Sequence, residues 1–144
     1  EPTPVRAMAP MSAALALATA GLAEEGIEGR RRAAAVWWRS LPEGPWTVPH
    51  VLEGGSGSYL RFPLVTSEAA IRDRLVSLLE RFGAARGYPA ALCDIEPARA
   101  IVAPTQQRAL EGARLLAARL FTLPTHSFVG KRDQRPVLEA LASL

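Results

Sequence analysis

Few residues of this 144-residue sequence combine the chemical type and the spacing that catalysis requires. Histidine occurs only at His50 and His126, and neither has a Cys, His or Asp nearby at the spacing of a metal ligand. A protein metal site takes three or four such ligands. The single cysteine, Cys93, lacks a recognisable catalytic partner and is expected to be a small buried residue. The single lysine, Lys131, lies in a polar turn that would not desolvate it enough to make a Schiff-base amine.

One short segment carries groups that are suited to ligand binding. Arg86 and Tyr88 flank a glycine and precede Pro89, directly after an amphipathic helix. A guanidinium and a phenol placed in this way are able to hold a phosphate or a carboxylate. Two interpretations stay open at this point: a loop that binds an anion, and a plain turn with a packed tyrosine.

Two other features resemble ligand sites less closely. The glycine-rich stretch 54–58 has no following Lys-Ser/Thr pair and leads into a strand, so the context excludes a P-loop or a dinucleotide fingerprint. Trp37 and Trp38 have aromatic faces that could stack on a ligand. At helical spacing, however, at least one of two such tryptophans usually belongs to the core.

The elements that must position these residues are helices and short strands. Leu60, Phe62 and Leu64 alternate along one predicted strand, and Pro63 predicts an edge or a bulge within it. Ser67 is a suitable N-cap for the most regular helix, which Gly83 ends. We predict an irregular segment over 84–103, strands over 46–51, 59–65 and 121–123, and helices over 10–22, 26–41, 68–82, 104–120 and 136–144. This order predicts a two-layer α/β (α+β) domain in which helices cover one face of a small sheet.

The composition narrows the classes of function. Seventeen basic residues exceed fourteen acidic ones by three, but the densest basic run, Arg30–Arg32, follows Glu24, Glu25 and Glu28. Such a run predicts a solvated helix face, and we expect no binding to nucleic acid. The apolar stretch Met8–Leu22 is too short and too rich in alanine to span a membrane. A single cysteine excludes an internal disulfide and suits a reducing compartment, so we expect a cytoplasmic protein.

The order of segments resembles the DegT/DnrJ/StrS family of sugar aminotransferases. The most specific part is a helix that runs into Leu-Pro-Thr-His, over 117–126. The resemblance extends from about Met8 to Leu144, and the other segments that carry it are Met8–Ala14, Arg31–Ala35 with Trp37 and Leu41, the strand 59–65, the helix to Gly83, and Gly87-Tyr88-Pro89.

The resemblance implies a pyridoxal-phosphate enzyme that moves an amino group from an amino acid onto a keto sugar nucleotide. Residues 8–144 would be its small C-terminal domain, and residues 1–7 a linker or the end of a preceding large domain. That large domain would hold the cofactor, so this chain alone should neither bind pyridoxal phosphate nor catalyse a reaction. Arg86 and Tyr88 become the candidate substrate-binding residues, and homodimers are expected.

The sequence also departs from the family. Val5-Arg6-Ala7 replaces an Asn-Tyr-Arg that the family often has there, so the phosphate-holding role of that Asn does not carry over. The loop between Cys93 and Pro104 lacks the family's aromatic and histidine pattern. The alternative is therefore a non-catalytic dimerisation or regulatory domain of a diverged relative.

Overall fold

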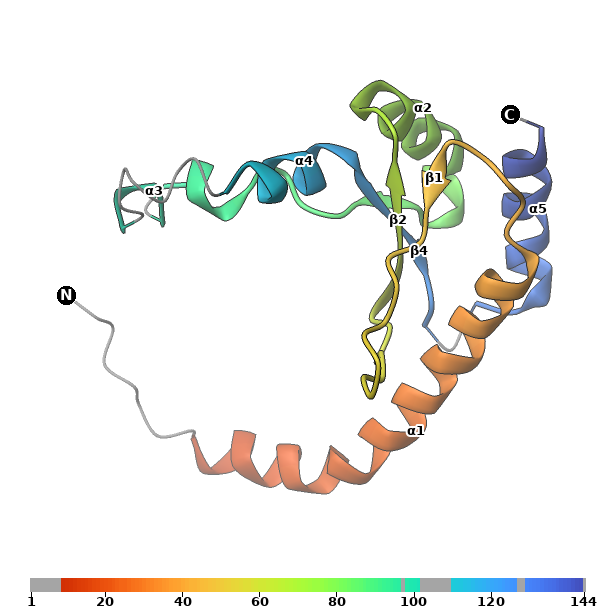
Figure 1. Cartoon of the computed structure of the whole chain (residues 1–144). Coiled ribbons are helices and arrows are strands. Elements are labelled where there is room, and N and C mark those ends of the chain that lie inside the picture. Colours follow the sequence, from red (N-terminus) through yellow and green to blue (C-terminus); the bar gives the residue numbers. More distant parts are fainter. Residues whose placement is uncertain (1–8, 97, 102–109, 127–128, 144) are drawn as a thin grey trace.

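A small antiparallel sheet with helices packed on one face forms the body of the molecule (Figure 1). The computed structural model describes residues 9–96, 98–101, 110–126 and 129–143. The sheet order is β1-β2-β4-β3, and every pairing is antiparallel. This arrangement confirms the predicted two-layer α/β class. The strands are β1 (Trp46–Thr47), β2 (Arg61–Thr66), β3 (Ala85–Arg86) and β4 (Leu120–Pro124), and the helices are α1 (Pro10–Ser40), α2 (Ala69–Leu79), α3 (Ala98–Ile101), α4 (Glu111–Arg119) and α5 (Lys131–Ala142), with 3-10 turns η1 (Glu80–Phe82) and η2 (Leu92–Asp94).

The first helix is longer than the sequence predicts. Instead of separate helices over 10–22 and 26–41, a single helix runs from Pro10 to Ser40. Gly21 and Gly26 weaken such a helix by about 1 kcal/mol each relative to alanine, but neither removes a backbone hydrogen bond as proline would. The prediction of a break was therefore wrong.

The core lies between the sheet and the helices α1, α2 and α5. Phe62 and Leu64 from β2 face this layer, as do Phe121 and Leu123 from β4. Trp37 of α1 is fully buried, and its indole nitrogen donates a 3.0 Å hydrogen bond to the Pro124 carbonyl oxygen. This bond ties the only long helix of the described chain to the end of the central strand β4.

The strand β2 begins later than predicted, at Arg61. The preceding Tyr59 has a left-handed backbone (φ 47°), and the Thr125 hydroxyl donates a 3.0 Å hydrogen bond to the Leu60 carbonyl. Because the chain bends there, Leu60 is 77% exposed and does not share a face with Phe62. Pro63 does lie at an edge, as predicted, since β1 pairs only with Val65 and Thr66.

Several other element boundaries differ from the predictions. The strand expected over 46–51 ends at Thr47, before Pro49. The N-cap of α2 is Glu68 rather than Ser67, and the helix continues into η1 before Gly83 ends it with φ 86°. The segment 84–103, predicted to be irregular, contains β3, η2 and α3.

The C-terminal helix also starts earlier than predicted. It begins at Lys131 rather than Pro136, because the Gly130 amide donates a 2.8 Å hydrogen bond to the Asp133 carboxylate and so caps the helix ahead of the proline. Lys131 therefore starts a helix instead of lying in a turn. The helix before β4 is predicted to start at Pro104, which lies outside the described residues. Among the described residues, this helix is α4 and covers 111–119.

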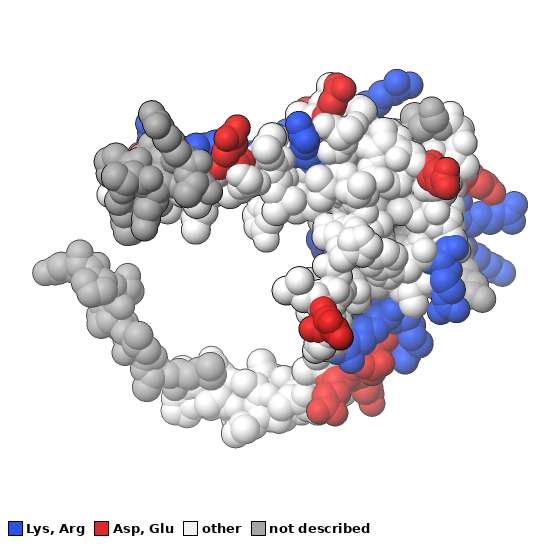
Figure 2. All heavy atoms as spheres, viewed as in Figure 1, with Lys and Arg blue, Asp and Glu red and all other residues white. Residues whose placement is uncertain are grey.

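The molecule is shaped like an open C. The first half of α1 and the arm formed by α3 and α4 both extend from the body (Figure 1), and the space-filling view shows a hollow between them (Figure 2). Figure 2 shows that charged side chains gather on the outer side, while few border the hollow. Residues 10–23 contain no charged residue at all. None of the described helices is long and apolar enough to cross a bilayer.

Candidate functional site

The face of the sheet opposite the core carries a groove. Along β2 the burial alternates, so that Arg61, Pro63 and Val65 lie on the face away from the buried Phe62 and Leu64. The groove on this face has a volume of about 420 Å³. It combines aromatic, aliphatic and hydroxyl groups with one cation, and its lining residues are Tyr59, Leu60, Arg61, Pro63, Gly87, Tyr88, Leu120 and Thr122.

Arg61 provides the positive charge of the groove. Its Nε atom donates a 2.6 Å hydrogen bond to the Thr122 hydroxyl, and Nη2 donates to the carbonyl oxygens of Thr122 and Gly83. Partial burial lowers the pKa of this guanidinium. None of the groove-lining residues is acidic, so the charge is held by neutral acceptors. The sequence analysis did not single out Arg61. The only available signal was the alternation along β2, which places Arg61 on the other face of the strand from Phe62.

Gly87 allows the chain to pass close to β4 at the edge of the groove. Its amide donates a 3.2 Å hydrogen bond to the Leu120 carbonyl oxygen. A Cβ atom at this position would lie 2.3 Å from Leu120 Cδ2, which is too close for any other residue without rearrangement. The glycine between the two predicted site residues therefore lets the backbone at position 87 lie close to Leu120, and this places Tyr88 at the groove.

Tyr88 lies where the groove meets a second cavity. Its side chain is 60% exposed and lines both spaces. The second cavity, about 370 Å³ in volume, lies along the arm between η2 and α4 and is lined almost entirely by apolar groups such as Leu92 and Leu116. Tyr88 is therefore accessible from both cavities and is not buried in the core.

Arg86 lies on the other side of the sheet. It pairs with Phe121 in the β3–β4 ladder, and its Nη2 is 2.9 Å from the Asp73 carboxylate of α2. The same carboxylate oxygen is 2.6 Å from Nε of Arg72, a buried side chain that donates to the Ala117 carbonyl. Arg86 is a strand residue with 57% of its side chain exposed. It lines neither cavity that Tyr88 lines, so the two predicted site residues do not converge on one cavity.

An ion pair joins η2 to α4 beside the second cavity. Arg114 of α4 binds the Asp94 carboxylate with two 2.9 Å contacts, from Nε to Oδ2 and from Nη2 to Oδ1. The hydrogen bond from Arg114 lowers the pKa of Asp94, against a smaller opposing effect of desolvation. Cys93, next in the chain, is 6% exposed, which confirms its predicted burial.

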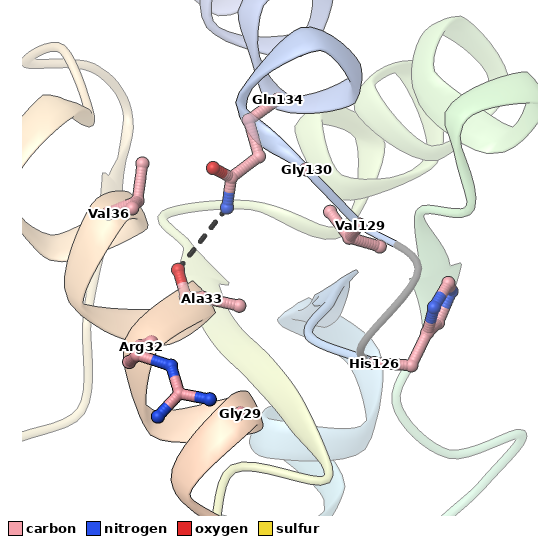
Figure 3. A pocket seen from close by; sticks show the side chains of 8 residues that line it. All are labelled: Gly29, Arg32, Ala33, Val36, His126, Val129, Gly130 and Gln134. Carbon is pink, nitrogen blue, oxygen red and sulfur yellow. Dashed lines mark hydrogen bonds between the residues drawn. The ribbon is translucent and has the colours of Figure 1, made fainter. Parts of the chain in front are cut away.

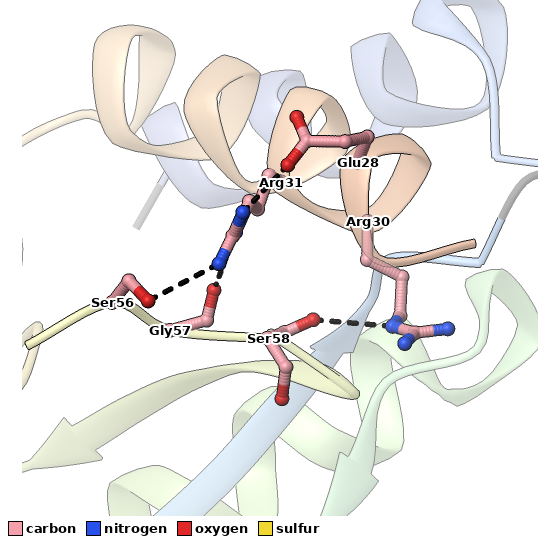
Figure 4. A network of polar contacts seen from close by, with 6 residues as sticks. All are labelled: Glu28, Arg30, Arg31, Ser56, Gly57 and Ser58. Carbon is pink, nitrogen blue, oxygen red and sulfur yellow. Dashed lines mark hydrogen bonds and ion pairs between the residues drawn. The ribbon is translucent and has the colours of Figure 1, made fainter. Parts of the chain in front are cut away.

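Two arginines of α1 hold the loop that leads into the groove (Figure 4). Arg31 donates from Nε to the Gly57 carbonyl at 3.1 Å and from Nη2 to the Ser56 hydroxyl at 3.2 Å. Arg30 donates a 3.1 Å hydrogen bond to the Ser58 carbonyl. The basic run predicted to be a solvated face thus includes two loop-binding side chains, which fix the segment immediately before Tyr59.

The remaining chemically capable residues form no shared centre. His126 lies in a third cavity, between α1 and α5, and shares no cavity with Tyr88. Among the described residues, no group of three or more His, Cys, Asp or Glu side chains is placed to hold a metal ion. The groove with Tyr88 and Arg61 is therefore the best-formed candidate binding site of the described chain.

Comparison with known proteins identifies relatives over most of the chain. A model of the DegT/DnrJ/EryC1/StrS aminotransferase family matches residues 6–142, whereas no curated protein sequence matches. Several solved structures share the fold, and three of them give the following values. A DegT DnrJ EryC1 StrS aminotransferase from Brucella abortus gives a TM-score of 0.67 at 21% identity, covering 88% of this chain and 33% of that one.

The other two structures give similar values. The aminotransferase TlmJ from Streptoalloteichus hindustanus has a TM-score of 0.68 at 20% identity, with 90% of this chain and 34% of that chain covered. The sugar aminotransferase CalS13 from Micromonospora echinospora has a TM-score of 0.60 at 17% identity, with 83% and 31% covered. The chain thus spans about a third of the length of each solved structure.

Proposed function

Because this chain belongs to the DegT/DnrJ/EryC1/StrS aminotransferase family, we propose that it is the C-terminal small domain of a pyridoxal-phosphate-dependent aminotransferase acting on a keto sugar nucleotide. The observation that carries this proposal is the groove on the sheet face that no helix of the core layer covers, with Tyr88 and Arg61 in its lining. A preceding large domain would close the groove from the other side, and an amino acid would donate the amino group.

The residues of this chain do not fit the cofactor by themselves. Its one lysine, Lys131, is the first residue of α5, and none of the described residues that line the groove is a lysine or an acid. We therefore place pyridoxal phosphate on the preceding large domain and assign no catalysis to this chain alone. When the chain is mixed with pyridoxal phosphate, we expect no saturable aldimine absorbance. A saturable band that disappears in the Lys131→Ala variant would contradict this expectation.

We assign substrate contacts to Tyr88 and Arg86. Tyr88 has its ring exposed between two cavities and would pack against the sugar or the nucleotide. Arg86 keeps more than half of its side chain exposed while it pairs with Asp73, and its remaining N–H groups would reach the diphosphate of the substrate or the carboxylate of the donor. Since they lie on opposite faces of the sheet, we expect the two residues to act on different parts of the bound molecules.

Steady-state kinetics of the full-length protein test this assignment. Charge-assisted hydrogen bonds contribute roughly 1.5–3 kcal/mol, so Arg86→Ala should raise KM for the sugar or the donor by about ten-fold or more. Tyr88→Ala should raise KM for the sugar substrate. The matched control is Arg74→Ala on α2, an exposed arginine outside both cavities. Unchanged KM values in folded Arg86 and Tyr88 variants would refute the assignment.

The second candidate is a non-catalytic dimerisation domain of a diverged relative. The uncharged and exposed first half of α1 favours it, because a large apolar patch of this kind usually marks a protein interface. The two candidates differ in the full-length protein. An aldimine absorbance there, together with amino transfer to a keto sugar nucleotide, supports the enzyme, and a full-length protein that lacks both supports the second candidate.

A further inference from the structure

A third cavity lies between α1 and the segment that leads into α5, and it shares no residue with the groove or with the arm cavity (Figure 3). Its volume is about 270 Å³, which suits a small ligand. Gly29 and Gly130 leave space on its two sides, since a Cβ atom at either position would make only ordinary contacts. The helix α1 lines one side, and His126, Val129 and Gln134 line the other.

The described residues that line the cavity carry positive charge and hydrogen-bond donors, and none of them is acidic. Arg32 is its cation, and no ion pair or hydrogen bond joins the Arg32 guanidinium to any other residue that the structure describes. The neighbouring Arg30 and Arg31 differ, because both are engaged with the loop 56–58. Of the three consecutive arginines, only Arg32 therefore offers its five N–H donors to a ligand.

Gln134 adds a fixed polar group. Its side chain is 2% exposed, and Nε2 donates a 3.2 Å hydrogen bond to the Ala33 carbonyl oxygen of α1 (Figure 3). This bond uses one of the two amide hydrogens and holds the side chain at the cavity wall. The start of α5 does not contribute its cap donor, because the Gly130 amide already binds Asp133. The site therefore depends on side chains, with His126 as a third polar group.

We propose that this cavity binds a small oxyanion, a phosphate or a carboxylate, with Arg32 as the charged anchor and Gln134 as a neutral donor. Guanidinium groups bind both kinds of oxyanion through paired hydrogen bonds. None of the described lining residues is acidic, and the neighbouring Asp133 carboxylate is bound to the Gly130 amide. The proposal does not depend on the assignment of the groove or on the aminotransferase function, because the two regions share no residue.

Isothermal titration calorimetry of the 144-residue chain tests the proposal, with inorganic phosphate and acetate as the two probes. We expect saturable binding of at least one probe, and the tighter probe identifies the oxyanion class. Arg32→Gln should weaken that binding by about ten-fold or more, as the loss of one charge-assisted contact predicts. The control is Arg39→Gln, which removes the same charge from an exposed position of α1 outside the cavity and should change the affinity less than about two-fold.

A second variant separates the cavity from a general effect of charge. Gly29→Leu keeps every charge and fills the space beside Arg32, and its helical position tolerates a side chain. We expect it to weaken binding as strongly as Arg32→Gln does. Absence of binding by both probes, or binding that Arg39→Gln weakens as much as Arg32→Gln, would overturn the proposal. Binding that Gly29→Leu leaves unchanged would also overturn it, because the anion would then lie outside the cavity.

Discussion

At the scale of single residues, adjacent tryptophans on α1 have different environments. Trp37 is fully buried and donates to the Pro124 carbonyl, whereas Trp38 is 40% exposed and packs edge-on against Phe62. Trp37→Phe removes the donor and leaves a buried carbonyl without its partner, which should lower the free energy of unfolding by about 1–3 kcal/mol. Urea denaturation measures this loss, and Trp38→Phe, the matched control, should cost less than about 0.5 kcal/mol. Equal losses would contradict the assigned role of the indole bond.

The Asp94–Arg114 pair makes a prediction about pH. The Arg114 hydrogen bond lowers the pKa of Asp94 in the folded protein, so the ionised carboxylate stabilises the fold. This contribution is present above the unfolded pKa of about 3.9 and is lost as the pH falls through the lower folded value. Arg114→Gln should return the Asp94 pKa towards its ordinary value, as an NMR titration of the carboxyl carbon would show. Arg99→Gln should have a much smaller effect, because the charge of Arg99 lowers the pKa of Asp94 far less than the Arg114 hydrogen bond does.

Single residues were predictable from sequence where one property decided the outcome. The burial of Cys93 and of at least one tryptophan followed from their apolar character and spacing. The groove did not follow, because Arg61, Tyr88 and Thr122 come from three separate segments that only the pairing of β2, β4 and β3 brings together. The contact between Arg86 and Asp73 was equally hidden, since it joins a strand to a helix across the edge of the sheet.

At the scale of elements, the loop before β2 depends on α1 for its position. Arg31 makes two hydrogen bonds to it, to Ser56 and to the Gly57 carbonyl. Arg31→Ala should release the loop and increase the rate of Glu-C protease cleavage at Glu53 by several-fold, because cleavage requires a locally open chain. Arg39→Ala, a change on the same helix that does not touch the loop, is the control. Equal cleavage rates in the two variants would show that the arginines do not restrain the loop.

Element types were predicted better than their limits. The apolar stripe of α2 and the alternation of β2 made the types of these two elements predictable, because each pattern has a clear period. The length of α1 was missed because glycine is a weak signal for a helix end when nothing else stops the helix. The start of α5 was missed because Pro136 suggested a first turn, whereas the Gly130–Asp133 cap sets the start five residues earlier.

At the scale of the whole molecule, charge and exposure are distributed unevenly. Charged side chains gather on the outer side, away from the hollow (Figure 2). On the uncharged half of α1, Met11 and Leu17 are about four-fifths exposed, at 81% and 79%. An apolar surface of this kind favours association, with a large domain in a longer protein or with a second copy in the isolated chain.

Sedimentation velocity over a range of concentrations tests this expectation. The chain should self-associate, and Leu17→Glu should weaken the association by about ten-fold or more, because burial of one leucine contributes roughly 1.5–3 kcal/mol. Ser143→Glu adds the same charge after α5, at an exposed position, and should leave the association unchanged. A chain that stays monomeric at high concentration would exclude this role for α1.

The length of α1 has a consequence for amide hydrogen exchange. One continuous ladder of hydrogen bonds joins Pro10 to Ser40, yet buried residues occur only at Ala33, Ala34 and Trp37. Opening of the first turns therefore disrupts almost no packing, while opening of the last turns requires the core to come apart. Protection factors should rise steeply along this helix, from values typical of a fraying peptide to those of global unfolding. A partner bound along residues 10–23 would be visible as new protection in the first half alone.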